Sequence, residues 1–367
     1  MHSFIENDCP RNTEENGNIV GPDDLILVTG AAGFIGSRVV DCLLHYGHRK
    51  IRCLVRPPGR GEHLRRLANT HRSSSHQIEI VSGNLLSSED CARATAGVSV
   101  IYHLAAGRGE KSFPDAFLNT VVTTRNLLQA SHQHGCLRRF VNVSSFSVYS
   151  NRGKPRRGLL DENSPVDPQP ALRGDAYAFA KLKQEEIVAE IGERWQIPFV
   201  IVRPGVVYGP GNEKITGRVG IDTFGVFLHL GGSNPIPFTY VDNCAQAIVL
   251  AGLRKGVDGE VFNVVDDDAP TSRTFLRMYK RQVGNFLSIS LPHWLSYLMS
   301  FGWEKYAEWS KGQLPLTYGR RAWHAFWKKT HYSNAKIKQR LGLKANISTE
   351  EGLRRYFKSC REKMHHA

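Results

Sequence analysis

The sequence lacks paired cysteine motifs and the common metal and hydrolase signatures. Its seven cysteines are odd in number, scattered, and never spaced as CxxC. This pattern excludes a disulfide framework or cysteine-rich zinc site and favours reduced thiols in a cytosolic-type compartment. No HExxH motif occurs among the fifteen histidines, and no GxSxG elbow is present. We therefore expect neither a metal centre nor a serine-hydrolase site.

Acidic residues are few compared with basic ones, since 48 Lys and Arg face 34 Asp and Glu, for a formal net charge of +14. Residues 320–363 alone carry thirteen Lys and Arg against three Glu. A solvated helical surface, a surface for anionic lipid and a surface for nucleic acid would each fit this excess. No zinc-finger spacing, homeodomain pattern or aromatic RNP-like strand accompanies the charge, so no nucleic-acid partner is expected.

Long apolar runs are also missing. Residues 1–23 are polar and predict a disordered leader rather than a signal peptide. Residues 286–303, FLSISLPHWLSYLMSFGW, contain no Asp, Glu, Lys or Arg, yet they are shorter and more polar than the roughly 20 apolar residues of a membrane span. Two interpretations stay open: a buried or lid helix, and a segment on a membrane surface next to the basic C-terminal region. We expect a cytoplasmic protein, with membrane association as the open alternative.

Short apolar runs alternate with helical patterns from residue 24 onward. The predicted strands are 25–29, 51–55, 78–81, 99–104, 139–143, 199–202 and 260–265, and the clearest predicted helices are 34–46, 115–134, 175–195 and 241–253. Such alternation predicts an α/β fold with a doubly wound parallel sheet, covered on both faces. We assign residues 24–204 and about 238–265 to a nucleotide-binding Rossmann domain. Residues 205–237 and 266–367 would form a smaller, mostly helical substrate domain.

A glycine-rich turn follows the first predicted strand. Gly30, Gly33 and Gly36 form a GxxGxxG pattern between that strand and a helix. The first glycine permits a tight turn, the second lets a pyrophosphate approach the backbone, and the third allows close packing of helix and strand. The N-terminus of the helix then offers N–H groups to phosphates. This context predicts a dinucleotide site.

The end of the second strand predicts which dinucleotide is bound. An NAD site usually has an acidic side chain there for the ribose 2′-hydroxyl. Here the residue is Arg56, and no Asp or Glu lies between Lys50 and Gly61. Because a guanidinium can bind a 2′-phosphate through charge-assisted hydrogen bonds, we expect NADP to be preferred, with NAD as the alternative. Arg60 could provide a second contact.

A catalytic pair occurs in the helical stretch YAFAK. Tyr177 and Lys181 are four residues apart and so share a helix face. Tyrosine ordinarily titrates near pH 10, and a neighbouring ammonium would stabilise its phenolate. Ser145, in VNVSSFSVY after a predicted strand, could hydrogen-bond a substrate oxygen.

Taken together, these motifs resemble the extended short-chain dehydrogenase/reductase family, the NAD-dependent epimerase/dehydratase group. The resemblance extends over residues 24–357. Further matches in the same order are YHLAAG (102–107), NTVVTTRNLL (119–128), IVRPGVVYGPGN (201–212) and FTYVDNCAQAI (238–248). The forms FTYVDN and RPGVVYGPG look closest to the 3β-hydroxysteroid dehydrogenase-like and dihydroflavonol reductase-like branches.

The resemblance implies roles for individual residues. Tyr177 would be the general acid/base, Lys181 would hold the nicotinamide ribose and lower the pKa of the tyrosine, and Ser145 would polarise the substrate oxygen. The positions implied to contact the cofactor are Gly30, Gly33, Phe34, Ile35, Gly36, Arg56, Asn84, Leu85, Ala105, Ala106, Asn119, Tyr177, Lys181 and Pro204. Asn84 replaces the family's common Asp, although its amide oxygen could still accept from the adenine amino group.

We therefore expect an oxidoreductase that interconverts a secondary alcohol and a ketone on a lipophilic or glycosyl substrate. The alternatives are a nucleotide-sugar epimerase or dehydratase and, from another class, a non-catalytic NADP-binding scaffold or sensor. Ile236 and Pro237 stand where many nucleotide-sugar epimerases carry an Arg–Asp pair for the diphosphate, which weakens the sugar alternative. Helices 115–134 and 175–195 could pair in a homodimer, as they often do in the family.

Overall fold

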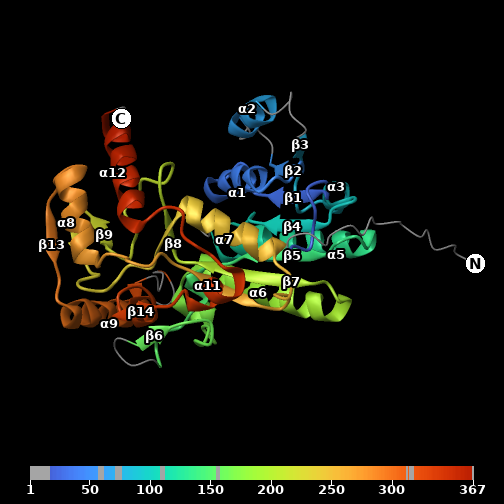
Figure 1. The fold of residues 1–367 in the computed structure, drawn as a ribbon. Helices are drawn as coiled ribbons and strands as arrows, with labels where there is room; N and C mark the ends of the chain where they lie inside the picture. The colour runs from blue at the N-terminus through green and yellow to red at the C-terminus, as the bar shows by residue number, and fades with distance from the viewer. Residues whose placement is uncertain are drawn as a thin grey trace, which may run out of the picture.

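A seven-stranded parallel sheet forms the centre of the molecule (Figure 1). The computed structural model describes residues 17–56, 62–70, 77–107, 112–153, 158–310, 313 and 318–365. The strand order is β12-β7-β5-β4-β1-β2-β3. In chain order the strands are β1 (Ile26–Thr29), β2 (Lys50–Val55), β3 (Gln77–Ser82), β4 (Val100–His103), β5 (Arg139–Val143), β7 (Phe199–Pro204) and β12 (Val261–Val264). The doubly wound parallel sheet is confirmed, with every predicted strand found at its expected place.

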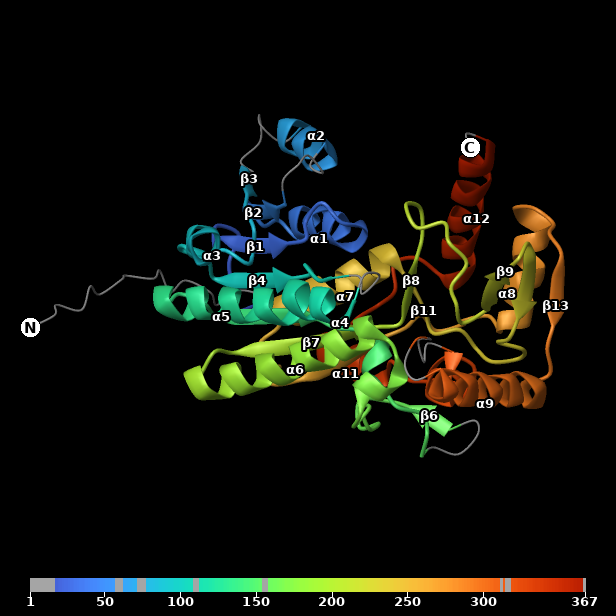
Figure 2. The same ribbon diagram turned by 180° about the vertical axis from the view of Figure 1, so that it is seen from behind.

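Helices cover both faces of this sheet. Helices α1, α7 and α11 lie over one face, while α3, α5 and α6 lie over the other (Figures 1 and 2). The elements up to α7 are α1 (Phe34–His45), α2 (Glu62–Thr70), α3 (Ser88–Thr95), α4 (Phe113–Phe117), the π-helical turn η1 (Leu118–Val122), α5 (Thr123–His134), the 3-10 turns η2 (Phe146–Val148) and η3 (Pro170–Arg173), α6 (Ala176–Trp195) and α7 (Val241–Leu253). The single helix predicted for 115–134 is thus α4, η1 and α5 in succession.

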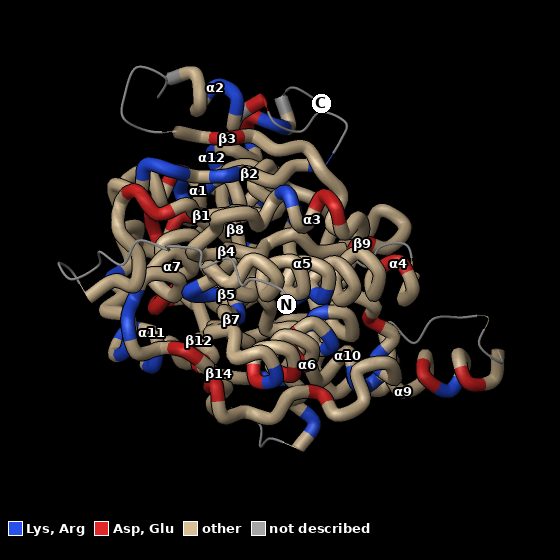
Figure 3. Tube along the Cα trace, turned by 90° about the vertical axis from the view of Figure 1, so that its right-hand side faces the viewer, with Lys and Arg blue, Asp and Glu red and all other residues tan. Residues whose placement is uncertain are grey.

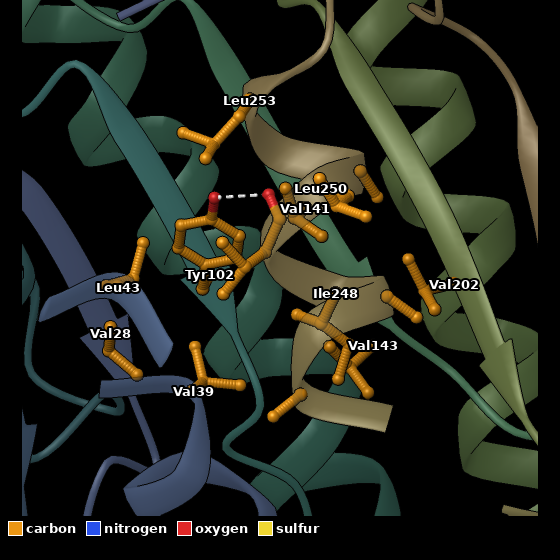
Figure 4. Packing of buried hydrophobic residues seen from close by; sticks show 14 of the residues in the cluster. Val28, Val39, Leu43, Tyr102, Val141, Val143, Val202, Ile248, Leu250 and Leu253 are labelled. Carbon is orange, nitrogen blue, oxygen red and sulfur yellow. Dashed lines mark hydrogen bonds between the residues drawn. The ribbon is translucent and has the colours of Figure 1, made fainter. Parts of the chain in front are cut away.

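The core on the α7 side shows how tightly helix and sheet pack. Tyr102 of β4 lies among Val28, Val39 and Leu43 in Figure 4, and its hydroxyl donates to the carbonyl oxygen of Val249 at 2.9 Å. A buried tyrosine hydroxyl needs such a partner, because an unmade hydrogen bond would cost free energy. Glycine is required beside it, since a Cβ at Gly252 would lie 2.2 Å from the Tyr102 hydroxyl.

The remaining elements form a smaller unit next to the carboxyl ends of the sheet strands (Figures 1 and 2). Its strands are β6 (Gly158–Leu160), β8 (Val206–Tyr208), β9 (Gly220–Thr223), β10 (Val226–His229), β11 (Phe238–Tyr240), β13 (Ser288–Ser290) and β14 (Thr330–Tyr332), and its helices are α8 (Ser272–Gln282), α9 (His293–Trp309), α10 (Arg320–Phe326), α11 (Ala335–Leu341) and α12 (Thr349–His365). Strands β13, β10 and β9 make a three-stranded sheet, and β11 with β8 and β14 with β6 make two-stranded ones. Helix α11 packs back on α7 and β12, so the chain returns to the large sheet before it ends.

Two predictions about the less regular segments can be compared with the structure. Residues 17–23 fell within the predicted leader, but they pack on the main body: Val20 is buried, and the Ile19 N–H donates to the Leu253 carbonyl at 2.8 Å. The apolar Val20 side chain stabilises this contact; residues 1–16 lie outside the described part. Segment 286–303 divides into β13 and most of α9. Of the helices described, none is both long and apolar enough to cross a bilayer.

Candidate active site

The glycine turn joins β1 to α1 and leaves no room for side chains. Gly30 has φ +67, and a Cβ there would lie 2.9 Å from the Ala105 backbone nitrogen. A Cβ at Gly36 would lie 2.1 Å from the Gly30 carbonyl oxygen. Helix α1 begins after Gly33 without a side-chain cap and without an acidic residue in its first turn. Its N–H groups therefore suit a phosphate, as the sequence predicted.

Arg56 reaches from the end of β2 toward the π-helical turn. Its side chain is exposed, and the Nη2 group donates to Oδ1 of Asn119 at 3.2 Å. Asn119 is itself held by α4, because its Nδ2 group donates to the carbonyl oxygen of Asp115 at 3.0 Å. Two residues predicted to contact the cofactor thus meet at the mouth of the sheet. Arg60 lies outside the described residues.

The other predicted cofactor residues border the same edge. Ala105 and Ala106 follow β4, and the Ala105 N–H donates to the Thr29 hydroxyl at 3.2 Å. Leu85 is buried, and its carbonyl accepts from Asn126 at 3.0 Å. Asn84 has a local task, since its side-chain oxygen accepts from the Leu86 N–H at 3.1 Å. An adenine amino group would have to share or replace that bond.

Three further predicted positions take part in packing. Phe34 and Ile35 are partly buried against the apolar cluster that includes Tyr208 and Phe238. Pro204 is buried at the last position of β7, directly before Gly205. Phe34 and Ile35 therefore connect the glycine turn with the smaller unit.

Ser145 and Tyr177 meet at the carboxyl end of β5. Helix α6 begins at Ala176, with the Asp175 side chain accepting from the Ala178 N–H at 3.0 Å, so Tyr177 stands in its first turn. The Ser145 hydroxyl lies close to Tyr177. Burial raises the pKa of Tyr177, the neighbouring Ser145 hydroxyl opposes this rise, and the Asp175 carboxylate adds to it. The structure therefore brings together two of the residues predicted to act on a substrate oxygen.

Lys181 lies one helical turn further along α6 and is buried. Its Nζ donates to the Val143 carbonyl at 2.7 Å and to Oε1 of Gln184 at 2.9 Å. Burial lowers the pKa of this lysine to about 7, although the nearby Glu185 carboxylate opposes the shift. An ammonium has three donors, so the two bonds found among the described residues leave one N–H for a ligand hydroxyl.

A chain of buried polar side chains continues behind Lys181. The Gln184 amide donates to the Thr124 hydroxyl at 2.9 Å, and Nε2 of His103 lies 2.9 Å from the same hydroxyl. The other ring nitrogen of His103 lies 2.8 Å from the Thr29 hydroxyl. Burial, together with the charge of Lys181, lowers the pKa of His103 to about 3, so the imidazole is neutral. The chain thus connects Lys181 to Thr29, which supports the Ala105 backbone.

A buried ion pair fixes α6 to β7. The guanidinium of Arg203 contacts Glu185 through two hydrogen bonds of 2.9 and 2.5 Å, and it also donates to the Tyr149 hydroxyl at 2.9 Å. Tyr149 donates in turn to Asn263 on β12 at 2.8 Å. Because buried charges need such pairing, this network holds the helix that carries Tyr177 and Lys181 in place.

The sequence analysis did not identify this supporting set. Its members are Thr29, His103, Thr124, Tyr149, Gln184, Glu185 and Arg203. Arg203 and Tyr149 lie inside the matched motifs RPGVVYGPG and SVY, so these motifs could have pointed to them. The contacts of the set could not be predicted from the motifs, because partners such as Thr29 and His103 are 74 residues apart.

The residues present fit a nicotinamide dinucleotide. The uncapped start of α1 and the space kept by Gly30 and Gly36 suit the pyrophosphate, while Arg56 and Asn119 border the adenosine end. The remaining N–H donor of Lys181 suits a hydroxyl of the nicotinamide ribose. When the dinucleotide is bound, its nicotinamide supplies or accepts hydride.

Known proteins share both the sequence pattern and the fold. The model of the NAD dependent epimerase/dehydratase family matches residues 26–264. A trifunctional UDP-glucose 4,6-dehydratase/UDP-4-keto-6-deoxy-D-glucose 3,5-epimerase/UDP-4-keto-L-rhamnose-reductase of Arabidopsis thaliana is 31% identical over 255 residues, which cover 65% of this chain and 36% of that protein. The chain thus spans only about a third of this relative.

Two other matches cover nearly the whole chain. A 2-alkyl-3-oxoalkanoate reductase of Stenotrophomonas maltophilia is 25% identical, over 90% of this chain and 97% of that protein. The crystal structure of a UDP-glucuronic acid 4-epimerase from Bacillus cereus in complex with NAD has a TM-score of 0.66 and 22% identity, over 92% of this chain and 96% of that one. The family match over residues 26–264 confirms the resemblance that the motifs indicated. This chain belongs to the NAD dependent epimerase/dehydratase family, within the extended short-chain dehydrogenases/reductases.

Proposed function

We propose that this protein is an NADP-preferring oxidoreductase that interconverts a secondary alcohol and a ketone on a lipophilic substrate. The observation that carries the proposal is the meeting of Ser145, Tyr177 and Lys181 at the carboxyl end of β5, where ligands of doubly wound folds bind. The proximity of Ser145 and Tyr177 supports a joint action on one substrate oxygen.

Each of the three side chains has a task that follows from its surroundings. The Tyr177 hydroxyl donates its proton to the carbonyl oxygen in reduction and takes it back in oxidation. The phenol is protonated at neutral pH, because its ordinary pKa near 10 is raised further by burial. The positive charge of Lys181 lowers the cost of forming the phenolate, and the Ser145 hydroxyl holds the substrate oxygen in line with Tyr177. Hydride transfer belongs to the cofactor.

The preference for NADP rests on Arg56. Its partner among the described residues is the neutral amide of Asn119, which leaves the guanidinium suited to a 2′-phosphate. An Arg56→Asp variant should lose affinity for NADPH by about tenfold or more and retain or improve affinity for NADH. Fluorescence titration of both reduced cofactors measures this. Equal affinity of the wild type for the two cofactors would remove the preference.

A lipophilic substrate is favoured by the residues before β11. Ile236 is buried, and it belongs to an apolar cluster with Phe238 and Phe275, at the place where sugar-nucleotide enzymes commonly carry an Arg–Asp pair. The 2-alkyl-3-oxoalkanoate reductase, which aligns over 90% of the chain, acts on such a compound according to its name. A 3-oxo acid with alkyl chains is therefore the substrate class we would test first.

A nucleotide-sugar epimerase or dehydratase is the second candidate, favoured by the Arabidopsis relative and by the many sugar-nucleotide enzymes of this fold. The same three residues would oxidise a carbinol and then return hydride. The two functions differ in cofactor balance, since epimerisation leaves the absorbance of the reduced nicotinamide unchanged.

The deciding experiment uses purified protein with NADPH for the reduction and with NADP⁺ or NAD⁺ for the sugar conversion, because the latter begins by oxidising a carbinol. Long-chain 3-oxo acids and UDP-sugars are supplied in parallel, while absorbance and product structure are both followed. Oxidation of NADPH with a 3-oxo acid supports the proposal; sugar conversion without net oxidation supports the second candidate. Tight NADP binding without turnover of either panel would point to a scaffold or sensor.

The homodimer predicted through α5 and α6 is a separate question, which sedimentation analysis tests.

A further inference from the structure

Helix α9 exposes its large apolar side chains and buries small ones, which is unusual for a helix packed on a protein core. The residues it buries are small: Ser296, Ser300 and Ala307. Those that it exposes are large and apolar or aromatic. They are Trp294, Tyr297, Leu298, Met299, Phe301, Tyr306 and Trp309, with exposed fractions from 36% to 76%. We call these seven residues the α9 face. A surface helix normally shows the reverse distribution.

The contacts of the buried edge explain why α9 forms without covering this face. The Trp323 indole of α10 donates to the Ser296 hydroxyl at 2.9 Å, which only a small residue would permit. Arg320, also on α10, contacts Glu304 of α9 through two hydrogen bonds of 2.9 Å. Two rings of the α9 face also touch α10 at their edge: the Tyr297 ring lies 5.0 Å from the Trp323 ring, and Arg320 lies 4.8 Å above the Phe301 ring. The C-terminal half of α9 projects from the body of the molecule (Figure 3).

The surroundings of the α9 face are apolar on one side. Leu287 and Ile289, on and beside strand β13, are 64% and 49% exposed and directly precede the helix. Strand β13 is an edge strand of the three-stranded sheet. The exposed apolar surface therefore continues from β13 onto α9, and such a patch on a folded protein marks an interaction site.

Basic residues outnumber acidic ones around the same surface, and the two acidic residues of α9, Glu304 and Glu308, pair with Arg320 and Lys305. Residues 269–303 contain no Asp or Glu, whereas α8 carries Arg273, Arg277, Lys280 and Arg281. Lys280 reaches β13, where its Nζ donates to the Ser288 hydroxyl at 2.7 Å. The two ring nitrogens of His229 lie 3.0 Å from the Ser272 hydroxyl, at the start of α8, and 3.0 Å from the Ser290 hydroxyl, shortly before α9. The start of α8 therefore lies close to the start of α9, and positive charge adjoins the apolar patch.

We propose that the α9 face, with Leu287 and Ile289, docks the protein on the surface of an anionic phospholipid bilayer. Tryptophan and tyrosine have an apolar body and a polar atom, which suits the headgroup level of a membrane. A helix with one apolar face and basic neighbours binds in the interfacial plane without crossing it.

The same charges disfavour a second copy of the chain as the occupant. A two-fold interface would place identical patches against each other, so the four basic residues of α8 would approach their own copies. The acidic residues of α9, Glu304 and Glu308, already pair with Arg320 and Lys305. Anionic headgroups satisfy both the apolar and the basic part of the surface.

The test is sedimentation of full-length protein with vesicles, which requires no turnover and so is independent of the proposed reaction. Vesicles of equal parts phosphatidylcholine and phosphatidylglycerol should bind the wild type, and phosphatidylcholine alone should bind it more weakly. The triple variant Trp294→Ser/Leu298→Ser/Trp309→Ser should bind at least about tenfold more weakly, because it removes apolar area from the contact. The matched control Tyr46→Ser/Leu86→Ser changes exposed apolar residues of the nucleotide-binding part and should bind as the wild type does.

A second set of variants tests the charges. Arg273→Gln/Arg277→Gln/Arg281→Gln should weaken binding to the mixed vesicles about tenfold or more, whereas Arg125→Gln/Arg194→Gln/Lys344→Gln should have little effect. Circular dichroism checks that each variant is folded. Absent vesicle binding by the wild type, or unchanged binding by the folded triple serine variant, overturns the proposal. So does a wild-type oligomer that the triple serine variant converts to monomer, because a second copy would then cover the face.

Discussion

Helices α6 and α9 depart in opposite directions from the usual division between buried apolar and exposed polar side chains. Helix α6 buries Lys181, Gln184 and Glu185 inside the protein. Helix α9 buries serines and exposes Trp294 and Trp309. Both therefore violate the amphipathic pattern that otherwise holds for helices on a core.

The two helices differ in whether their unusual side chains have partners within the protein. Every buried polar group of α6 has a partner: Lys181 has Gln184 and Val143, and Glu185 has Arg203. The exposed aromatic rings of α9 do not require a partner within the protein. Their contact with water costs free energy, but it leaves no buried charge or hydrogen-bonding group unpaired. Natural sequences break local rules mainly at functional sites. One departure lies in the candidate active site, and the other forms the proposed membrane face.

The largest effect is expected on turnover, when the Tyr177 hydroxyl of α6 is removed. Tyr177→Phe should lower turnover by about 10²–10⁴-fold, because the general acid/base is lost while the ring remains. Initial rates of cofactor oxidation with an accepted substrate measure the effect. Tyr306→Phe on the α9 face is the matched control and should retain full activity. Full activity of Tyr177→Phe would contradict the proposed mechanism.

A large effect on stability is expected from the buried ion pair. Arg203→Met leaves Glu185 as an uncompensated buried charge and should lower the free energy of unfolding by about 3–5 kcal/mol. Arg194→Met breaks an exposed pair with Glu190 on α6 and should cost less than about 1 kcal/mol.

Urea denaturation measures both variants of this second comparison. The double variant Glu185→Leu/Arg203→Met should recover most of the loss, since it removes both charges. Equal losses for Arg203→Met and Arg194→Met would show that burial of the pair does not matter.

A smaller effect should appear in cofactor binding as a function of pH. With the pKa of Lys181 lowered to about 7, the ammonium is present below that pH and is lost as the pH rises through it. Affinity for the cofactor should therefore fall above about pH 7. Gln184→Ala removes an acceptor of the charged form, so it should lower that pKa further, move the fall to lower pH, and weaken binding at pH 7 about tenfold.

Gln184→Glu is the matched variant for this third test. A carboxylate beside the ammonium should raise the pKa of Lys181 and move the loss of affinity to higher pH. Titrations of the cofactor at several pH values distinguish the two variants. Identical pH profiles for wild type and both variants would exclude Gln184 as a positioning residue for Lys181.

The smallest effect is expected on the exposed side of α9. Leu298→Lys should change the free energy of unfolding by no more than about 0.5 kcal/mol, since Leu298 is 55% exposed. Ser300→Leu on the buried edge should instead cost about 1–3 kcal/mol through overpacking. Thermal or urea unfolding compares the two. A large loss with Leu298→Lys would show that the face is covered within the protein itself.

The large sheet could be predicted because its strands are buried on both faces. Runs such as 25–29 and 199–202 are almost continuously apolar, which is typical of central parallel strands. Strands β9 and β13 were not predicted, since Asp222 and Ser288 interrupt any apolar pattern and their strands have only four and three residues. These short strands depend on pairing with β10, not on their own sequence.

The candidate site could be predicted where function imposes a fixed spacing. The glycines and the pair Tyr177–Lys181 belong to short local patterns, and the structure places them at one edge of the sheet. The residues behind them, such as His103, Gln184 and Arg203, carry no comparable pattern. A buried polar side chain is explained by its partners, and those are contributed by distant strands and helices.

The sequence by itself determined the family, the doubly wound sheet and the proposed catalytic trio, because glycine geometry, strand burial and helical spacing are local properties. Only the tertiary structure decided that Lys181 is buried with a pKa of about 7, and that α9 turns its serines inward. The apolar composition of residues 286–303 was visible from the start. Which side of that helix faces water depends on Trp323 and Arg320, and these contacts form only when α10 folds against it.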